Sequence, residues 1–527
     1  MIYKIPTEVL TVVDKLKKNK FQAYLVGGCV RDLLRRTIYG ELVEPKDWDI
    51  ATDATPEETQ KFFFDFSGRT KEDPATVYEN DFGTVGIKTE SEDPRLKIIE
   101  VTTFRKEGKY TDKRHPDKVI FSQTIIDDLS RRDFTVNAMG IELGAMDKVL
   151  GIKNKLKKTN PVSLFIIHDS PFTLVDPYGG QDDLKKKLIR AVGNPDERFN
   201  EDALRLMRAV RFASELGFEI EEKTAEAITR HAGLLEMIAK ERVRDELTKI
   251  IMSARPMMGI EMLERFGLLK HIMPEMREGI GVGQNLHHIY TVWEHNLRAL
   301  QYTADKKYDF LIRMAAFLHD VGKPRSKQGN GKYSTFYGHE MIGAKMTPAI
   351  LDRLHYEKGF IEQVAHLVRH HLFYYNVGEV TAAGVRRFLA RVGPDNIPDL
   401  IKIREADRIG SGVPKAVPYK LRHLLFMIEK VKRDPISPKM LAIRGEDVMA
   451  IAGIPPSPKV GQILAILLEE VLDDPQKNKK EYLTEQIKKL VMFSEDELKK
   501  IAAKSKERKE EFETGIEEEM KKQFYVK

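Results

Sequence analysis

The sequence is poor in the features that would place it in several protein classes. It has one cysteine, Cys29, in 527 residues, which excludes an internal disulfide and a thiolate metal cluster and suits a reducing cytoplasm. No apolar run approaches the roughly 18 residues that span a bilayer, and the charged N-terminus is not a signal peptide. Neither charge dominates, since 87 Lys and Arg face 81 Asp and Glu. We therefore expect a cytoplasmic protein without membrane contact, in which any nucleic-acid-binding face is local.

The chain changes character near residue 200. Before it, short apolar runs at 21–28, 48–52, 83–88 and 97–104 predict strands, and residues 55–64 predict a helix that Thr55 caps, with Pro56 in its first turn. After it, apolar residues recur at helical spacing, as in EDALRLMRAVRFASELGF (201–218). At 42% hydrophobic residues, this length predicts three or four domains. The fold class is α+β, with a mixed sheet first and helical domains after it.

Two aspartates stand one residue apart in KDWDIAT (46–52). Because side chains alternate along a strand, Asp47 and Asp49 would point the same way and repel each other. Such a pair binds a hard cation such as Mg²⁺, which shares its remaining ligands with phosphates. An isolated DxD pair is more often a solvated or capping pair, so the pattern needs a second feature.

The second feature is the glycine turn LVGGCVRD (25–32), about 20 residues upstream. Gly27 and Gly28 allow close approach of a ligand to the backbone, and the following helix start with Arg31 attracts a triphosphate. Glycines here are often turn formers alone. The glycine turn followed by the aspartate pair, however, resembles the nucleotidyltransferases related to DNA polymerase β.

Two further polar clusters follow. In DLSRRDFTVNAMG (128–140), Arg132 could neutralise phosphate, and Asp133 and Asn137 could bond a ribose. In the helix after residue 200, a polar stripe recurs every third residue and consists of Asp202, Arg205, Arg208 and Arg211. A capped helix and a solvated face are the plain alternatives for these two clusters.

These motifs in order resemble the class II tRNA nucleotidyltransferases, the CCA-adding enzymes, over most of residues 20 to 480. The resemblance implies a polymerase-β-like head, then all-α neck, body and tail domains, and addition of CCA to tRNA 3′ ends from CTP and ATP. It implies that Asp47 and Asp49 are catalytic and hold Mg²⁺. Asp202 and Arg205 would read the incoming base, because a carboxylate accepts from the amino group of C or A while guanidinium donates to the ring nitrogen. The remaining nucleotide contacts would be Gly28, Arg31, Arg132, Asp133, Asn137, Arg208 and Arg211.

Most of the histidines lie between residues 287 and 408, around a His-Asp doublet in FLHDVGKP. This region resembles the HD phosphohydrolase domain of many bacterial CCA-adding enzymes. By that resemblance a second divalent metal (Mn, Ni, Fe or Mg) would be held by His295, His319, Asp320 and Asp407, and His339, His370 and His371 could complete a two-metal site. Nitrogen and oxygen ligands suit such ions. The alternative is a structural remnant.

The expected domains are the head at 1–195, with an inserted loop or hairpin at 151–172, the neck at 196–286, the HD domain at 287–410 and the tail at 411–527. The tail segment before a helix near Lys459 could bind tRNA backbone, or could be an ordinary helical corner. The last stretch, from Ser494, reads as a long solvated helix.

Three other activities stay open. They are addition of A alone or of CC alone, poly(A) polymerisation, and HD phosphohydrolysis with a merely RNA-binding N-terminal half. Residues 104–128 fill the place of the family's flexible loop for switching from C to A, which argues against CC-only addition. Oligomeric state is not readable from the sequence.

Overall fold

The structure is a computed structural model that describes residues 5–37, 39–64, 75–80, 83–107, 119–143, 162–167, 170–285, 289–373, 375–378, 380–413, 415–432, 441–473, 475–501 and 525. The chain forms two compact units. The first is Met1–Arg369 with Ile409–Gly412, and the second is His370–Arg408 with Val413–Lys527.

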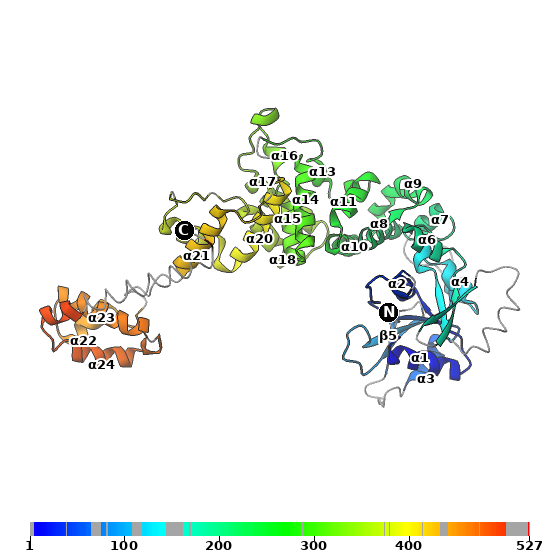
Figure 1. The fold of residues 1–527 in the computed structure, drawn as a ribbon, viewed down its shortest axis with the longest axis horizontal. Coiled ribbons are helices and arrows are strands. Elements are labelled where there is room, and N and C mark those ends of the chain that lie inside the picture. Colours follow the sequence, from blue (N-terminus) through cyan, green and yellow to red (C-terminus); the bar gives the residue numbers. More distant parts are fainter. Residues whose placement is uncertain are drawn as a thin grey trace. The chain divides into compact units, whose positions relative to one another are not determined.

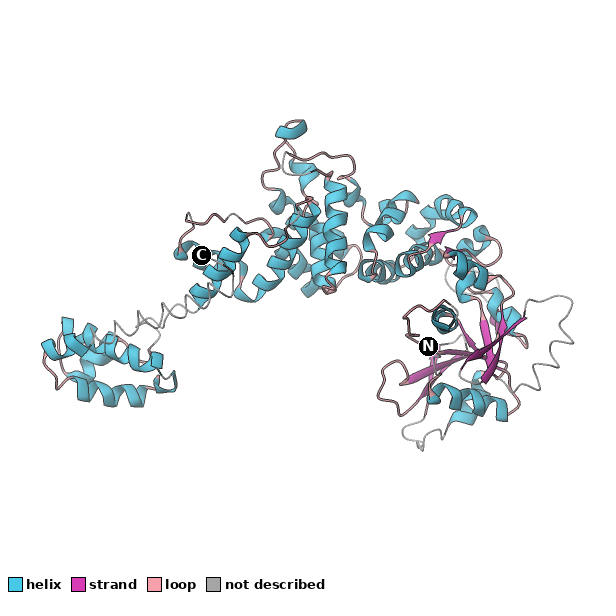
Figure 2. Cartoon of the chain, viewed as in Figure 1, coloured by secondary structure: helices cyan, strands magenta, loops and turns pink. Residues whose placement is uncertain are grey.

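The N-terminal part of the first unit is built on a mixed eight-stranded sheet of order β3-β4-β5-β2-β1-β8-β10-β9 (Figure 2). Its strands are β1 (Ala23–Val26), β2 (Asp49–Thr52), β3 (Thr76–Asn80), β4 (Thr84–Lys88), β5 (Ile98–Thr103), β8 (Gly140–Leu143), β9 (Val162–Ile167) and β10 (Ser170–Val175). The β2–β5 pair is parallel and the other pairs are antiparallel. The predicted α+β head with a mixed sheet is confirmed.

The helices of this part cover both faces of the sheet. Figure 1 shows α1 (Thr7–Lys18) and α3 (Pro56–Phe63) on one face and α2 (Gly28–Thr37) on the other. The start of α3 follows the sequence prediction, because Thr55 caps it in a reciprocal capping box with Glu58 and Pro56 opens it. The helix α6 (Gly180–Lys186) follows β10.

One detail differs from the sequence predictions, and two others add to them. Strand β2 begins at Asp49, so Asp47 lies in a bend before the strand rather than on it. Residues 104–128 contain the antiparallel pair β6 (Arg105–Glu107) and β7 (Val119–Phe121), then α4 (Ile125–Ser130), and residues 108–118 lie outside the described residues. Of the expected insertion, 162–167 and 170–172 form the β9–β10 hairpin, and 151–161 are not described.

The rest of the first unit is mostly helical, as predicted. Its first helices are α7 (Pro195–Glu201), α8 (Leu204–Leu216), α9 (Glu222–His231), α10 (Lys240–Met252) and α11 (Pro256–Arg265). One parallel ladder, which periodicity did not predict, joins β11 (Leu188–Ile189) to β12 (Glu219–Ile220). Then come α12 (Leu269–Ile272), α13 (Pro274–Arg277), α14 (Val292–Asp305), α15 (Phe310–Leu318), α16 (Lys323–Ser326), α17 (His339–Asp352) and α18 (Lys358–His370).

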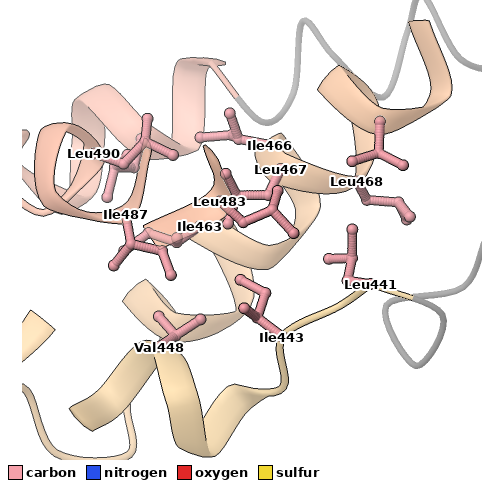
Figure 3. Packing of buried hydrophobic residues seen from close by; sticks show 12 residues of the cluster. Leu441, Ile443, Val448, Ile463, Ile466, Leu467, Leu468, Leu483, Ile487 and Leu490 are labelled. Carbon is pink, nitrogen blue, oxygen red and sulfur yellow. The ribbon is translucent and has the colours of Figure 1, made fainter. Parts of the chain in front are cut away.

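The regular secondary structure of the second unit, within its described residues, is helical. It contains α19 (Ala382–Val392), α20 (Ile397–Gly410), α21 (Tyr419–Lys432), α22 (Gly445–Ala452), α23 (Pro458–Asp473) and α24 (Lys480–Leu490). The last three helices enclose a core of their own, in which Val448, Ile463 and Leu483 point toward one another (Figure 3). The predicted helix near Lys459 is α23. The predicted long C-terminal helix is described as helix only at 495–501, and 502–524 lie outside the described residues.

Candidate active site

A tight turn joins β1 to α2 at the centre of the sheet. Gly27 has φ +77°, and a Cβ there would lie 2.9 Å from Arg132 Nη1 and 3.2 Å from Asp49 Oδ2. Both the backbone conformation and the space therefore require glycine. The turn brings the start of α2 next to the aspartate pair, as the sequence order predicted.

The two aspartates lie at a cleft of about 720 Å³. Asp49 opens β2 in the middle of the sheet, and Asp47 lines the same cleft from the preceding bend. Burial raises the pKa of Asp49, the Arg132 guanidinium opposes that rise, and the Asp47 carboxylate adds to it. The two negative charges repel each other, and a bound divalent cation would offset this repulsion.

Arginines and polar groups form the wall next to the aspartates. Arg31 donates from Nη1 to Asn137 Oδ1 at 2.9 Å and pairs with Asp32, also at 2.9 Å. Arg132 pairs with the buried Asp128 at 3.2 Å. These contacts hold the guanidiniums in place, because each has a fixed partner behind it.

Helix α8 supplies further residues to the lining of the cleft. Arg208 pairs with Asp133 at 2.6 Å. Although burial acts against it, the guanidiniums of Arg208 and Arg205 lower the pKa of Asp133, so that this carboxyl is ionised. The cleft is thus lined by cationic groups from α2, from the segment after α4 and from α8, together with its carboxylates.

Of the predicted nucleotide and metal residues, nine line this one cleft: Gly28, Arg31, Asp47, Asp49, Arg132, Asp133, Asn137, Arg208 and Arg211. They come from four separate parts of the sequence. A cleft of this size, lined by many charged side chains of both signs, fits a small charged ligand.

The predicted base-reading residues lie outside the lining. Asp202 ends α7 and pairs with Arg242 at 2.9 Å. Arg205 is buried, pairs with Glu201 at 2.5 Å and donates to the Arg131 carbonyl at 3.1 Å. The expected polar stripe is also not a solvated face, since α8 is buried on nearly every side.

The cleft also contains residues that the sequence did not single out. The Phe212 ring lies under three guanidiniums, with centroid distances of 4.2 Å to Arg211, 5.3 Å to Arg208 and 5.7 Å to Arg31. Arg211 pairs with the buried Glu246 of α10 at 3.0 Å, and Lys249 reaches the cleft from one turn later. The sequence signal for Glu246 and Lys249 was the helical periodicity of α10, which does not indicate which helix or cleft α10 packs against.

Cys29 lies behind the aspartates in α2. It is 2% exposed, and burial together with the Asp49 carboxylate raises the pKa of its thiol to about 12. It therefore stays protonated at neutral pH and is not a nucleophile.

A second cluster of possible ligands lies between α14 and α17. His295 Nε2 is 2.8 Å from His319 Nε2 and 3.0 Å from Asp320 Oδ2, and His339 Nε2 is 3.3 Å from Asp320 Oδ1. All four residues are buried. Lys323 pairs with Asp320 at 2.5 Å, and although burial opposes them, Lys323 and His319 hold the pKa of Asp320 well below its usual range.

The ring orientations in this cluster suit metal binding. His319 Nδ1 bonds the Ala316 carbonyl and His339 Nδ1 bonds the Phe336 carbonyl, both at 2.7 Å. A carbonyl only accepts, so each Nδ1 carries a proton, and Nε2 is the ring nitrogen that is left for a ligand position.

The other predicted ligands belong to the second unit. Asp407 is buried on α20 beside Arg404, and His371 is buried just after α18, whereas His370 is half-buried at its end. Their role as ligands stays a prediction.

Comparison with known proteins relates these features to families. Residues 23–190 match the family described as the poly A polymerase head domain, 217–280 a probable RNA- and SrmB-binding site of polymerase A, and 287–411 the HD domain. The A-adding tRNA nucleotidyltransferase of Deinococcus radiodurans is 34% identical over 366 residues, which cover 67% of this chain and 76% of that protein. This chain belongs to the tRNA nucleotidyltransferase family.

Other members of the family match as well. The CC-adding tRNA nucleotidyltransferase of Thermus thermophilus is 34% identical over 65% of this chain and 72% of its own. The CCA-adding enzyme of Limosilactobacillus reuteri is 40% identical, but over 49% of this chain and 53% of its own. The Bacillus stearothermophilus CCA-adding enzyme, solved in complex with CTP, has a TM-score of 0.54 at 25% identity and covers 92% of this chain and 96% of its own.

Family membership establishes a nucleotidyltransferase head, an HD domain and dependence on a divalent metal. The relatives add different nucleotides, so membership does not select among them. Within the described residues, no helix combines the length and the apolar character needed to cross a membrane.

Proposed function

We propose that the protein adds or repairs the 3′-terminal CCA of tRNA, without a nucleic-acid template, from CTP and ATP. The observation that carries the proposal is the Asp47–Asp49 pair at a cleft that is also lined by Arg31 of α2, by Arg132 and by Arg208 and Arg211 of α8. The order of domains in the matched families agrees with it.

Different residues of the cleft would have different roles in nucleotidyl transfer. Asp47 and Asp49 would hold Mg²⁺, which lowers the pKa of the attacking 3′-hydroxyl and neutralises phosphate charge when bound. The start of α2, Arg31 and Arg132 are placed to bind the triphosphate, since backbone N–H groups and guanidiniums pair with its oxygens. Asn137 and Asp133 would form hydrogen bonds to the ribose. The leaving group of the transfer is pyrophosphate.

Base selection is assigned to Asp202 and Arg205. Guanine and uracil present a carbonyl where cytosine and adenine present an amino group, so an ionised carboxylate would face an acceptor and leave it unpaired. Arg205 lies near the cleft, because its charge contributes to the low pKa of the cleft residue Asp133.

Addition of A alone is the second candidate, because the A-adding relative matches over more of its length than the CCA-adding relative does. The test offers tRNA lacking zero, one, two or three terminal nucleotides with each NTP singly and in pairs. CTP followed by ATP incorporation that stops at full length supports CCA addition. Products with A only, CC only or long A tails each select the corresponding rival.

The matched control for this test is Asp49→Ala. It should abolish incorporation if the aspartates hold the catalytic metal. Unchanged incorporation would instead favour a protein whose N-terminal half only holds RNA.

We further propose that His295, His319 and Asp320 bind a second divalent metal (Mn, Ni, Fe or Mg) with Asp407, and that His339, His370 and His371 extend the site. The donor chemistry fits such ions. A phosphatase assay with Mn²⁺ or Ni²⁺ and a His319→Ala control tests this site, and no activity with either ion would leave it a structural remnant.

A further inference from the structure

Arg242 contacts the predicted base-reading carboxylate directly. It lies in the first turn of α10, and its guanidinium forms a fork on Asp202, with Nη2 2.9 Å from Oδ2 and Nη1 3.3 Å from Oδ1. Oδ1 also accepts from the Leu204 backbone N–H at 3.0 Å. Asp202 thus has a fixed orientation, set by one side chain and one backbone group.

The position of Arg242 is not one that helix stability favours. The N-terminus of a helix carries partial positive charge, so a cation in the first turn is repelled by the helix itself. The Asp202 carboxylate compensates this repulsion, and both side chains are largely removed from solvent. Helix stability therefore does not explain why an arginine occupies this position.

The two carboxylate oxygens of Asp202 differ in the hydrogen bonds that they accept, and this difference supplies a reason. A carboxylate oxygen has two acceptor positions. Among the described residues, Oδ1 accepts from both Arg242 and Leu204, whereas Oδ2 accepts from Arg242 alone. The arrangement leaves an acceptor position on Oδ2 for an amino group.

We infer that Arg242 is a positioning residue for nucleotide selection, which aims Oδ2 of Asp202 at the amino group of cytosine or adenine. The inference rests on the proposed role of Asp202 as a base reader. Asp202 ends α7 and lies two residues before α8, and α8 is held to α10 elsewhere, by Arg211–Glu246 at 3.0 Å and by the Ser214 and Ser253 hydroxyls at 2.6 Å. The Asp202 orientation can therefore be changed without separating α8 from α10.

The test compares Arg242→Gln with Arg244→Gln. Arg244 is on the same helix with a similarly exposed side chain, but it bonds the His355 carbonyl at 2.7 Å and pairs with Asp245. The measurement is kcat/KM for CTP and for UTP on tRNA lacking its last two nucleotides. Loss of a hydrogen bond to a charged group predicts that Arg242→Gln lowers the CTP-to-UTP ratio by roughly 10-fold, while Arg244→Gln leaves the ratio unchanged.

A merely structural role would lower both rates together and leave the ratio constant. Arg242→Lys keeps the charge but not the fork, so it should give an intermediate ratio, and it serves if Arg242→Gln does not fold. If Asp202→Ala loses discrimination while both Arg242 variants retain it, the inference is overturned and the proposed function stands. If Asp202→Ala also discriminates normally, base reading by Asp202 is itself refuted.

Discussion

Substitution of Gly180 should disturb the nucleotide site although Gly180 does not line it. An added Cβ at Gly180 would lie 2.2 Å from the Thr135 carbonyl oxygen and 2.9 Å from Met139 Cγ. Ordinary contact begins at 3.4 Å, so the backbones would separate by the difference between 3.4 and 2.2 Å, about 1.2 Å. We therefore expect Gly180→Ala to push away the turn that begins at Thr135.

That turn carries Asn137, a predicted nucleotide-binding residue. It spans Thr135–Asn137, and Asn137 Oδ1 accepts from Arg31. The turn cannot relax freely, because Thr135 Oγ1 donates to Asp183 at 2.6 Å and Thr135 N–H donates to the Arg190 carbonyl at 2.9 Å. The displacement should reach the cleft and lower kcat/KM for CTP about 100-fold, the scale of loss that follows a 1 Å misplacement, with an overpacking cost of about 2 kcal/mol in unfolding free energy.

Steady-state CTP incorporation and denaturant unfolding measure the two effects. The control is Gly359→Ala, because Gly359 lies in α18 with open space around its Cβ position, and alanine there should be neutral or stabilising. A Gly180→Ala protein with wild-type KM and kcat would refute the argument that α6 positions this turn.

Three further outcomes are expected. Asp49→Asn should lower incorporation by at least about 100-fold at saturating CTP without loss of folded protein, since it removes a charge from the metal site; a normal rate would contradict its role. Asp128→Asn should cost about 3 kcal/mol in unfolding free energy at pH 7 by breaking a buried pair. Burial raises the pKa of Asp128, but Arg131 and Arg132 outweigh that effect and lower it. The ionised carboxylate therefore stabilises the fold fully above its ordinary pKa, and this stabilisation is lost as the pH falls through the lowered pKa of the folded state. The unfolding curves of the two proteins should thus converge in acid. Gly322→Ala would place a Cβ 2.2 Å from the His339 carbonyl oxygen and so displace His339. In an Asp49→Asn background, a Mn²⁺ titration should then show binding about 10-fold weaker. Unchanged Mn²⁺ binding would contradict a ligand role for His339.

Local sequence signals predicted the parts of the site that are set within one short segment. The strand, glycine turn and helix around Gly27 follow from residue types alone, as does the capped start of α3 at Thr55. The aspartate pair also came together as predicted, although the strand begins at Asp49 rather than before Asp47.

Contacts between distant segments were not predictable in the same way. Periodicity placed Asp202 and Arg205 on one stripe with Arg208, but it contained nothing about α10, whose Arg242 holds Asp202. The stripe looked amphipathic because arginine is usually solvated, whereas burial of Arg205 and Arg211 is satisfied here by acidic partners and carbonyls. The two-residue ladder between β11 and β12 is too short for any period to predict.

The buried thiol of Cys29 has a practical consequence. With a pKa of about 12 and 2% exposure, it will react slowly with maleimide at neutral pH, because thiolate is the reactive form. Since no other cysteine occurs in the chain, donor and acceptor fluorophores can be attached to two introduced surface cysteines, one in each unit, and the distance between them can then be followed as RNA is added.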